Sequence, residues 1–363
     1  MIPPRPHLMN RGPFLKGESS GPFSFFRWAG LKQRLISIPV LAKCHLMANY
    51  KAYFGNWQIR HESGPIMGKK GGGVVLVSPY YGSDHLLCWF IDYHRKLGVE
   101  EFVFLDLSTQ GDLSAKLTGQ SDCAVWRPHG VSAPIPSLHG LNVLRWRYAT
   151  GRWCLSLQPD ERFVFFRSET RRINDLIDFL ESEHRGHIYA LTLEMYGERA
   201  AETLELRDGE DPLSLLPYFD PMGYAIAEDT GIVRGGVQRR TLFNKAPRHS
   251  PALNRIPLVK WGRNCAYIAG TRLLLPHRLN EPHPPWHTSP TACVLSFAQL
   301  ESASALAVAA RAEVEDIIKD GPPGNFDGMI RLREFVQKTT CSARYTATSD
   351  LVESGLLNPG QWF

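Results

Sequence analysis

Apolar and polar residues follow two kinds of pattern in the first half of the chain. Residues 74–78 form a short β-branched run that is typical of a buried strand. Residues 86–97 place apolar side chains at helical spacing and predict an amphipathic helix, which Gly98 ends. Residues 99–105 predict a second strand that runs into the polar loop 106–111. The pattern therefore predicts a strand–helix–strand unit whose loop lies at the edge where open α/β sheets bind ligands.

The same alternation continues further along the chain. Short strands are predicted at residues 123–127, 151–157 and 187–196, and helices at 141–148 and 174–183. Strands and helices of this length in alternation indicate a mostly parallel sheet covered on both faces. We therefore expect an α/β fold.

The strand predicted at 151–157 ends in an acidic turn, Gln158-Pro159-Asp160-Glu161, after which the apolar chain resumes. Carboxylates at the exit of a central strand are costly to bury unless a cation lies on them. A metal ion, a metal-bound phosphate or an arginine would each meet that need. The alternative is a surface turn in which both acids are solvated.

The two ends of the chain differ from this central part. Residues 1–22 are rich in proline and glycine, and residues 23–38 interleave aromatic and apolar side chains with basic ones. The second segment is too short to span a bilayer. It either lies on a membrane surface or packs on the main domain as a covering helix. Near the other end, the alanine-rich residues 300–319 predict a helix.

Composition limits the classes of function. The 363 residues are 43% hydrophobic and 21% charged, which is enough to bury one large core or two moderate ones. The net charge of +5 is small and scattered, so we expect no nucleic-acid partner. The seven cysteines are odd in number and include no CxxC pair, which argues against a disulfide framework and favours a reducing cytoplasm.

The order of these elements resembles the GT-A glycosyltransferases, in particular the bacterial family-2-like proteins. That family has a helix with a W..YH..LG motif, then a strand with an Asp-Asn-Ser-Thr-Asp-Gly type of loop, and later a strand ending in Asp-x-Asp. The helix motif is matched by Trp89, Tyr93, His94, Leu97 and Gly98, and the loop by Asp106, Ser108, Thr109 and Gly111. The acidic turn matches the family's Asp-x-Asp followed by Glu and Phe. The resemblance covers about residues 71–300.

The resemblance implies a GT-A type, Rossmann-like α/β fold with a mostly parallel sheet flanked by helices. We expect a flexible and then amphipathic N-terminal extension at residues 1–70 and a glycosyltransferase domain at 71–290. A helical C-terminal portion would occupy residues 291–363 and pack on the core.

The resemblance also implies a function. The expected activity is hexosyltransferase-like transfer from a nucleotide sugar, linked to UDP, to a glycan or lipid-linked acceptor in polysaccharide synthesis. Asp106 and Ser108 would contact the nucleotide, and Ser78 would line its pocket. Asp160 and Glu161 would hold Mg2+ or Mn2+, which prefer oxygen ligands. Such an enzyme would be cytoplasmic, with peripheral contact to the inner face of the membrane through the N-terminal segment.

An inverting transferase needs a carboxylate that accepts the proton of the acceptor hydroxyl. Glu194, near the end of the strand predicted at 187–196, is the first candidate for this general base. Asp220, in a Tyr-Phe-Asp-Pro sequence, is the rival. The alternatives are an ordinary acid at a strand end and an aspartate that caps its own turn.

Two later segments are candidates for ligand contacts. Arg239 follows a pair of glycines and suits a loop that closes over a diphosphate, and Lys260 is a weaker candidate for the same role. Structural salt bridges are the competing account. His277, His283 and His287 share a proline-rich loop, whose Trp286 suits an acceptor-side contact better than the histidines suit a metal site.

Three positions depart from the family pattern. Gln158 replaces the first carboxylate of Asp-x-Asp, Gly82 stands where an Asn-Glu pair ends, and Ser296 stands where the family often has a histidine. These departures support an alternative function: a non-catalytic relative that keeps the GT-A fold and binds a nucleotide or glycan without turnover.

Overall fold

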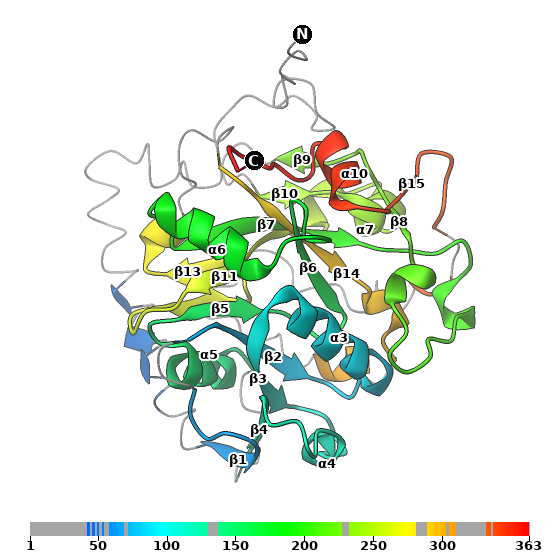
Figure 1. Ribbon diagram of the computed structural model, residues 1–363. Coiled ribbons are helices and arrows are strands. Elements are labelled where there is room, and N and C mark those ends of the chain that lie inside the picture. The colour runs from blue at the N-terminus through cyan, green and yellow to red at the C-terminus, as the bar shows by residue number, and fades with distance from the viewer. Residues whose placement is uncertain are drawn as a thin grey trace.

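The computed structural model describes residues 58–68, 72–129, 137–226, 232–280, 289–302, 305–309, 332–334 and 337–362, with scattered positions between 42 and 53. Within these ranges the central element is a nine-stranded sheet in the order β1-β4-β3-β2-β5-β11-β7-β14-β6 (Figure 1). Its strands are β1 (Ile59–Ser63), β2 (Val74–Tyr80), β3 (Val99–Asp106), β4 (Cys123–Pro128), β5 (Trp153–Ser156), β6 (Glu161–Phe165), β7 (His187–Glu194), β11 (Asn254–Lys260) and β14 (Ala292–Ser296).

Six of the nine strands run in the same direction. β2 pairs in parallel with β3 and β5, β3 with β4, and β7 with β14. β11 lies antiparallel between β5 and β7, and β1 and β6 are antiparallel strands at the two sheet edges. The expected mostly parallel sheet, flanked by helices, is thereby confirmed. The carboxyl ends of six strands meet at one edge of it.

Helices cover both faces of the sheet because alternate strand residues point to opposite sides. Val74 and Leu76 of β2 belong to one apolar core, which they share with α3 (Asp84–Leu97) and α6 (Ile173–Ser182). Val75 and Val77 belong to a second core, which they share with α5 (Ser137–Ala149). Each of these helices lies where the spacing of apolar residues predicted one.

The helix motif of the resemblance fixes α3 against β6. Tyr93 Oη donates to the Phe163 carbonyl at 3.1 Å. His94 Nδ1 lies 2.8 Å from the Phe90 carbonyl, and its Nε2 accepts from the Phe163 N–H at 3.4 Å. Burial lowers the pKa of His94 to about 3, so the ring is neutral at pH 7. Tyr93 and His94 therefore have a structural role: they hold α3 against β6.

Gly98 ends α3 in the left-handed conformation, with φ at 114°. Its N–H reaches the carbonyls of His94 and Arg95, as in other left-handed helix caps. A Cβ at this position would lie 3.2 Å from Ile173 Cγ2. The glycine therefore permits both the cap and the close approach of α6.

Shorter elements complete the described part. They are α4 (Leu113–Lys116), η1 (Ala201–Thr203), η2 (Pro212–Ser214), β8 (Tyr218–Phe219), β9 (Ala225–Ile226), β10 (Val233–Arg234), α7 (Gly236–Thr241), η3 (Pro247–His249), β12 (Ala266–Ala269), β13 (Leu273–Leu275), η4 (His277–Asn280), η6 (Ala298–Leu300), β15 (Ala343–Arg344) and α10 (Thr348–Glu353). The pairs β8–β15 and β9–β10, with α7 and α10, gather at one end of the molecule, near β7 and β14 (Figure 1).

Several expectations concern the ends of the chain. β1 precedes the boundary expected at residue 71, β14 follows the one expected at 291, and both strands belong to the central sheet. The helix expected at 300–319 is described only at 305–309. Residues 23–38, and His283 and His287, lie outside the described residues. Within the described part, no helix has the length and apolar character needed to cross a membrane.

Candidate active site at the carboxyl edge of the sheet

The acidic turn is buried. Asp160 and Glu161 are 4% and 3% exposed. The turn closes through the Glu161 N–H, which donates to the Gln158 carbonyl at 3.0 Å, and through the Gln158 N–H, which donates to Glu161 Oε2 at 2.8 Å. The interpretation as a solvated surface turn is therefore wrong. Two adjacent carboxylates in a low-dielectric setting need compensation by positive charge or by protons.

Arg255 compensates Glu161. Arg255 Nη1 lies 2.5 Å from Glu161 Oε1, and Nη2 lies 3.1 Å from Oε2, so the contact is a two-point ion pair. Arg255 precedes Pro257, which has no N–H and sits where the β11–β7 ladder shifts register between Arg255 and Leu258. Both oxygens of Glu161 are engaged by protein donors, which leaves Asp160 better placed to face a cation.

Asp160 feels the charge of a second buried acid, Glu301, which sequence reasoning missed. Ser296 Oγ donates to Asp160 Oδ2 at 3.1 Å. Burial, with the charges of Glu161 and Glu301, raises the pKa of Asp160 well above its usual range. Burial also raises the pKa of Glu301 to about 7, and the Ser83 hydroxyl donates to this carboxyl. Glu301 follows η6 in a segment whose local pattern predicted only a helix, so nothing nearby marked it as a site residue.

Asp106 lies at the same edge, where β3 ends. Its Oδ1 accepts from the Ser108 N–H at 2.9 Å and from Ser108 Oγ at 2.6 Å. Burial is the largest cause of the raised pKa of Asp106. The structure thus brings the predicted residues Asp106 and Ser108 together in one turn. Ser78 precedes the end of β2 by two residues and is fully buried within the strand.

Glu194 is the last residue of β7 and lies next to the hydrogen bond between Ser296 and Asp160. It is the register partner of Ser296 on β14, whose hydroxyl holds Asp160. The Gln238 N–H donates to Glu194 Oε2 at 3.0 Å, and the Gln238 side-chain amide donates to Oε1. Burial outweighs these hydrogen bonds and raises the pKa of Glu194 to about 7. A carboxyl with a pKa near the working pH is suited to general base catalysis.

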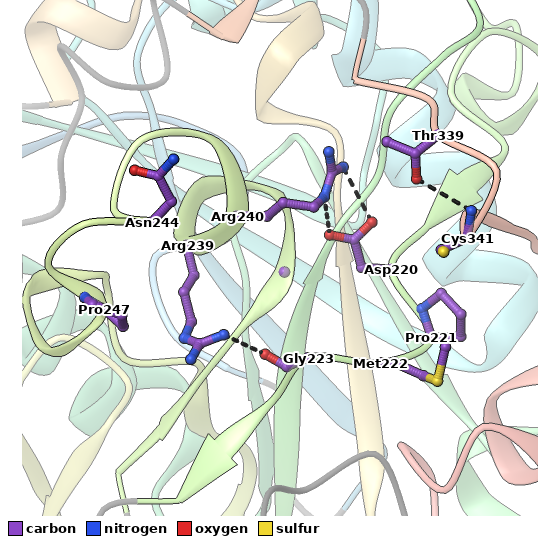
Figure 2. Close-up of a pocket in the computed structure, with 11 residues that line it drawn as sticks. Asp220, Pro221, Met222, Gly223, Arg239, Arg240, Asn244, Pro247, Thr339 and Cys341 are labelled. Atoms are coloured by element: carbon purple, nitrogen blue, oxygen red, sulfur yellow. Dashed lines mark hydrogen bonds and ion pairs between the residues drawn. The ribbon is translucent and has the colours of Figure 1, made fainter.

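Asp220, the rival base, is engaged more firmly. Arg240 Nε and Nη2 lie 3.0 Å and 3.2 Å from its two oxygens. The Tyr196 hydroxyl also donates to Asp220. Figure 2 shows the Asp220–Arg240 pair at the wall of a cavity. An aspartate clamped by a guanidinium and a hydroxyl is less free to accept a substrate proton than Glu194.

The cavity has a volume of about 360 Å³ and is lined by residues that follow β8, by α7 and by the segment before β15. Arg239 and Arg240 leave α7 in different directions: Arg240 reaches Asp220, and Arg239 Nη1 donates to the Gly223 carbonyl at 2.9 Å (Figure 2). Glu194 lies behind this wall, because a Cβ on Gly236 would be 3.2 Å from its Oε2. The two arginines and both candidate bases therefore share one neighbourhood.

Lys260 does not join this neighbourhood. It ends β11 and is the register partner of Trp153, the first residue of β5. Because β11 runs antiparallel, Lys260 lies at the opposite edge of the sheet from Asp160. There its ammonium group pairs with Glu181 at 3.0 Å, so the expectation that it assists Arg239 is corrected.

The carboxylates at the edge can be tested for fit to a divalent cation. The described residues contain no group of three or more His, Cys, Asp or Glu side chains arranged to hold a metal. Asp160 and Glu301 are both buried, the charge of Glu301 acts on Asp160, and a bound cation would favour the ionised form of each. Mg2+ commonly binds through one or two carboxylates and completes its shell with water and phosphate. Asp160 with Glu301 fits that pattern, and Glu161, held by Arg255, does not.

Comparison with known proteins gives little further guidance. The sequence matches no protein-family model and no curated protein. Among solved structures, the fold overlaps in part with the crystal structure of residues 1–349 of S. aureus TarS, at a TM-score of 0.26 and 21% identity. That overlap covers 35% of this chain and 36% of the TarS chain, so this chain spans about a third of the length of that structure. A likeness this limited carries no argument about function.

Proposed function

We propose that this protein is a metal-dependent glycosyltransferase that moves a sugar from a UDP-linked donor to a glycan or lipid-linked acceptor. The observation that carries the proposal is the row of buried carboxyl groups along one sheet edge: Asp106 at the end of β3, Glu194 at the end of β7 and Asp160 directly before β6. Ligands of open α/β sheets bind at this edge. Polysaccharide synthesis at the inner face of a membrane is the corresponding setting.

On the donor side, Asp106 and Ser108 form a compact turn that can accept and donate hydrogen bonds to a nucleoside. Asp160 and Glu301 would hold Mg2+ or Mn2+, which when bound neutralises the negative charge of the leaving diphosphate. Ser83 and Ser296 orient these two carboxylates through their hydroxyl groups. Ser78, buried inside β2, would support the pocket from behind.

On the acceptor side, Glu194 is the proposed general base. Its carboxylate takes the proton of the acceptor hydroxyl while that oxygen forms a bond to the anomeric carbon of the donor sugar. The bond from the anomeric carbon to the diphosphate oxygen breaks, and the diphosphate leaves with the electron pair. Gln238 keeps the Glu194 side chain in place, and burial holds its pKa near 7, so it ionises within the physiological range.

A second candidate function is binding without turnover. The ion pair of Glu161 with Arg255 and the replacement of an acid by Gln158 leave fewer free carboxylates than the family pattern has. If the metal is not held, the same edge still offers Asp106 and Ser108 to a nucleotide. The two functions differ in whether nucleotide binding depends on a divalent cation.

The deciding experiment measures UDP and UDP-sugar binding to the full chain by calorimetry, with and without Mn2+. We expect Mn2+ to strengthen UDP binding at least tenfold, and Asp160→Asn to remove that gain. Asp178→Asn is the matched control, because Asp178 is an exposed acid on α6. Metal-independent binding would favour the second function, and no UDP binding at all would reject both the UDP-dependent transferase and a UDP-binding relative.

A further inference from the structure

The charges of the residues that line the cavity beside Glu194 do not cancel. The charged lining residues are Asp220, Arg239 and Arg240, which sum to one net positive charge. Asp220 is paired with Arg240, so the surplus charge belongs to Arg239. The Nε of Arg239 is buried and has no hydrogen-bond partner among the described residues. Because this atom has almost no accessible surface, a ligand in the cavity would meet the outer nitrogens of the guanidinium, of which Nη1 also donates to the Gly223 carbonyl.

The cavity lies away from the part of the sheet edge that would bind the nucleotide, near Asp106. Asp106 ends β3 and Glu194 ends β7, and β2, β5 and β11 lie between these two strands. Neighbouring strands are about 4.8 Å apart, so the two ends are roughly 19 Å apart along the edge. Asp160 precedes β6 and is held by Ser296 of β14, so a donor that runs from Asp106 to an ion at Asp160 passes the end of β7, where Glu194 lies. The cavity behind Glu194 is then on the acceptor's side.

The lining also limits what kind of acceptor group fits. Among its described lining residues none is aromatic, so the cavity lacks the flat apolar surface on which sugar rings stack. Its volume of about 360 Å³ is at the lower end of the range for ligand sites and suits one head group or one sugar unit. Asn244 and Thr339 add neutral polar groups to the wall.

We propose that this cavity binds an anionic group of the acceptor, a phosphate or a carboxylate, through the guanidinium of Arg239. Arg forms paired hydrogen bonds with both kinds of oxyanion, which explains why an arginine rather than a ring lines the site. The assignment replaces the expectation that Arg239 closes over the donor diphosphate. It rests on the proposed function, because the acceptor side is defined by Glu194.

The test uses the full chain and three small probes: inorganic phosphate, galacturonate and neutral galactose, each titrated by calorimetry or by ligand-observed NMR. We expect at least one anionic probe to bind tenfold or more tightly than galactose, and the preferred probe identifies phosphate or carboxylate as the group. Arg239→Gln should weaken that binding at least tenfold. Arg248→Gln, which removes an exposed arginine of the nearby η3, should leave it unchanged.

UDP binding in the presence of Mn2+ separates the two proposals. Arg239→Gln should leave UDP affinity within twofold of the unmodified protein, and a larger loss would return Arg239 to the donor side and overturn the inference. Equal binding of galactose and the anions, or anion binding that survives Arg239→Gln, would overturn it as well. If UDP fails to bind while anions still bind through Arg239, the proposed function is contradicted and anion binding by the cavity is not. An unchanged unfolding temperature of Arg239→Gln confirms that any loss is local.

Discussion

Glu161 and Arg255 form a two-point ion pair across the sheet, with Nη–Oε distances of 2.5 Å and 3.1 Å. Their strands, β6 and β11, are not neighbours, because β14 and β7 lie between them. The pair therefore ties the far edge of the sheet to its middle. It also decides the role of the acidic turn, since it removes one of the two carboxylates that the sequence offered to a metal.

Breaking this pair on one side should destabilise the fold strongly. Arg255→Met leaves Glu161 buried without a countercharge, and loss of one partner of a buried pair costs about 3–5 kcal/mol. Urea unfolding followed by tryptophan fluorescence measures the change. The exposed pair of Lys260 and Glu181 is the control, where Lys260→Met should cost less than about 1 kcal/mol. Similar losses in the two variants would show that the Glu161 pair is not the anchor described here.

Glu301 should matter to metal binding although it lies far from the acidic turn in sequence. Glu301→Gln removes one of two proposed ligands, so we expect the Mn2+-dependent gain in UDP affinity to fall at least tenfold. Titration of UDP at several Mn2+ concentrations measures it. Glu161→Gln is expected to lower the stability of the fold. In the protein that remains folded, the Mn2+-dependent gain in UDP affinity should be unchanged. If Glu161→Gln abolishes the metal dependence and Glu301→Gln does not, the ligand assignment is reversed.

Transfer should depend on pH through Glu194. A base with a pKa of about 7 is active only when ionised, so kcat/KM should rise with pH and level off above about 7. The Gln238 side-chain amide helps to lower this pKa, so Gln238→Leu, which keeps the backbone hydrogen bond and loses the side-chain one, should move the rise to higher pH. Glu194→Gln should reduce kcat by at least about a hundredfold, the usual scale of general base catalysis. A pH profile that Gln238→Leu leaves in place would exclude Glu194 as the titrating group.

The same carboxyl makes stability depend on pH in the opposite direction. Its pKa of about 7 in the folded state lies above the ordinary value of 4.5, so the folded protein holds a proton that the unfolded chain releases. The stability contributed by that proton is present below about pH 4.5 and is lost as pH rises toward 7. In Glu194→Gln this part of the decline should disappear, as urea unfolding at pH 5, 6 and 7 would reveal. An equally steep decline in the variant would assign it to other groups.

Gly98 should resist substitution for two separable reasons. Gly98→Ala forces a left-handed φ on a residue with a Cβ, at about 1–2 kcal/mol, and brings that Cβ to 3.2 Å from Ile173. Gly119 also has a left-handed φ, at 87°, but a Cβ there would meet nothing within 4 Å. Thermal unfolding of both alanine variants therefore isolates the contact with α6. Equal losses would show that conformation alone explains the glycine.

Local periodicity predicted several elements of the fold, but not the strands β1, β11 and β14 of the central sheet, nor the partners at the site. The helix at Asp84–Leu97 and its end at Gly98 follow from apolar spacing and one glycine. The ion pair of Glu161 with Arg255 and the effect of Glu301 on Asp160 arise where segments distant in sequence meet in the fold. A short sequence window cannot predict such contacts. Lys260 was misplaced because no strand was predicted at residues 254–260, and β11 runs antiparallel to its neighbours.

β11 also has a consequence for the order in which the molecule is assembled. β5 and β7 both pair with β11 and not with each other, and β11 is synthesised after both of them. A nascent chain that has emerged only as far as β7 thus holds one partial sheet, β1-β4-β3-β2-β5, whose unpaired edge at β5 is open to mispairing, while β6 and β7 still lack their partners. The donor and acceptor sides become one surface only when residues 254–260 insert between them. A strand that holds neither proposed base thus completes the catalytic edge.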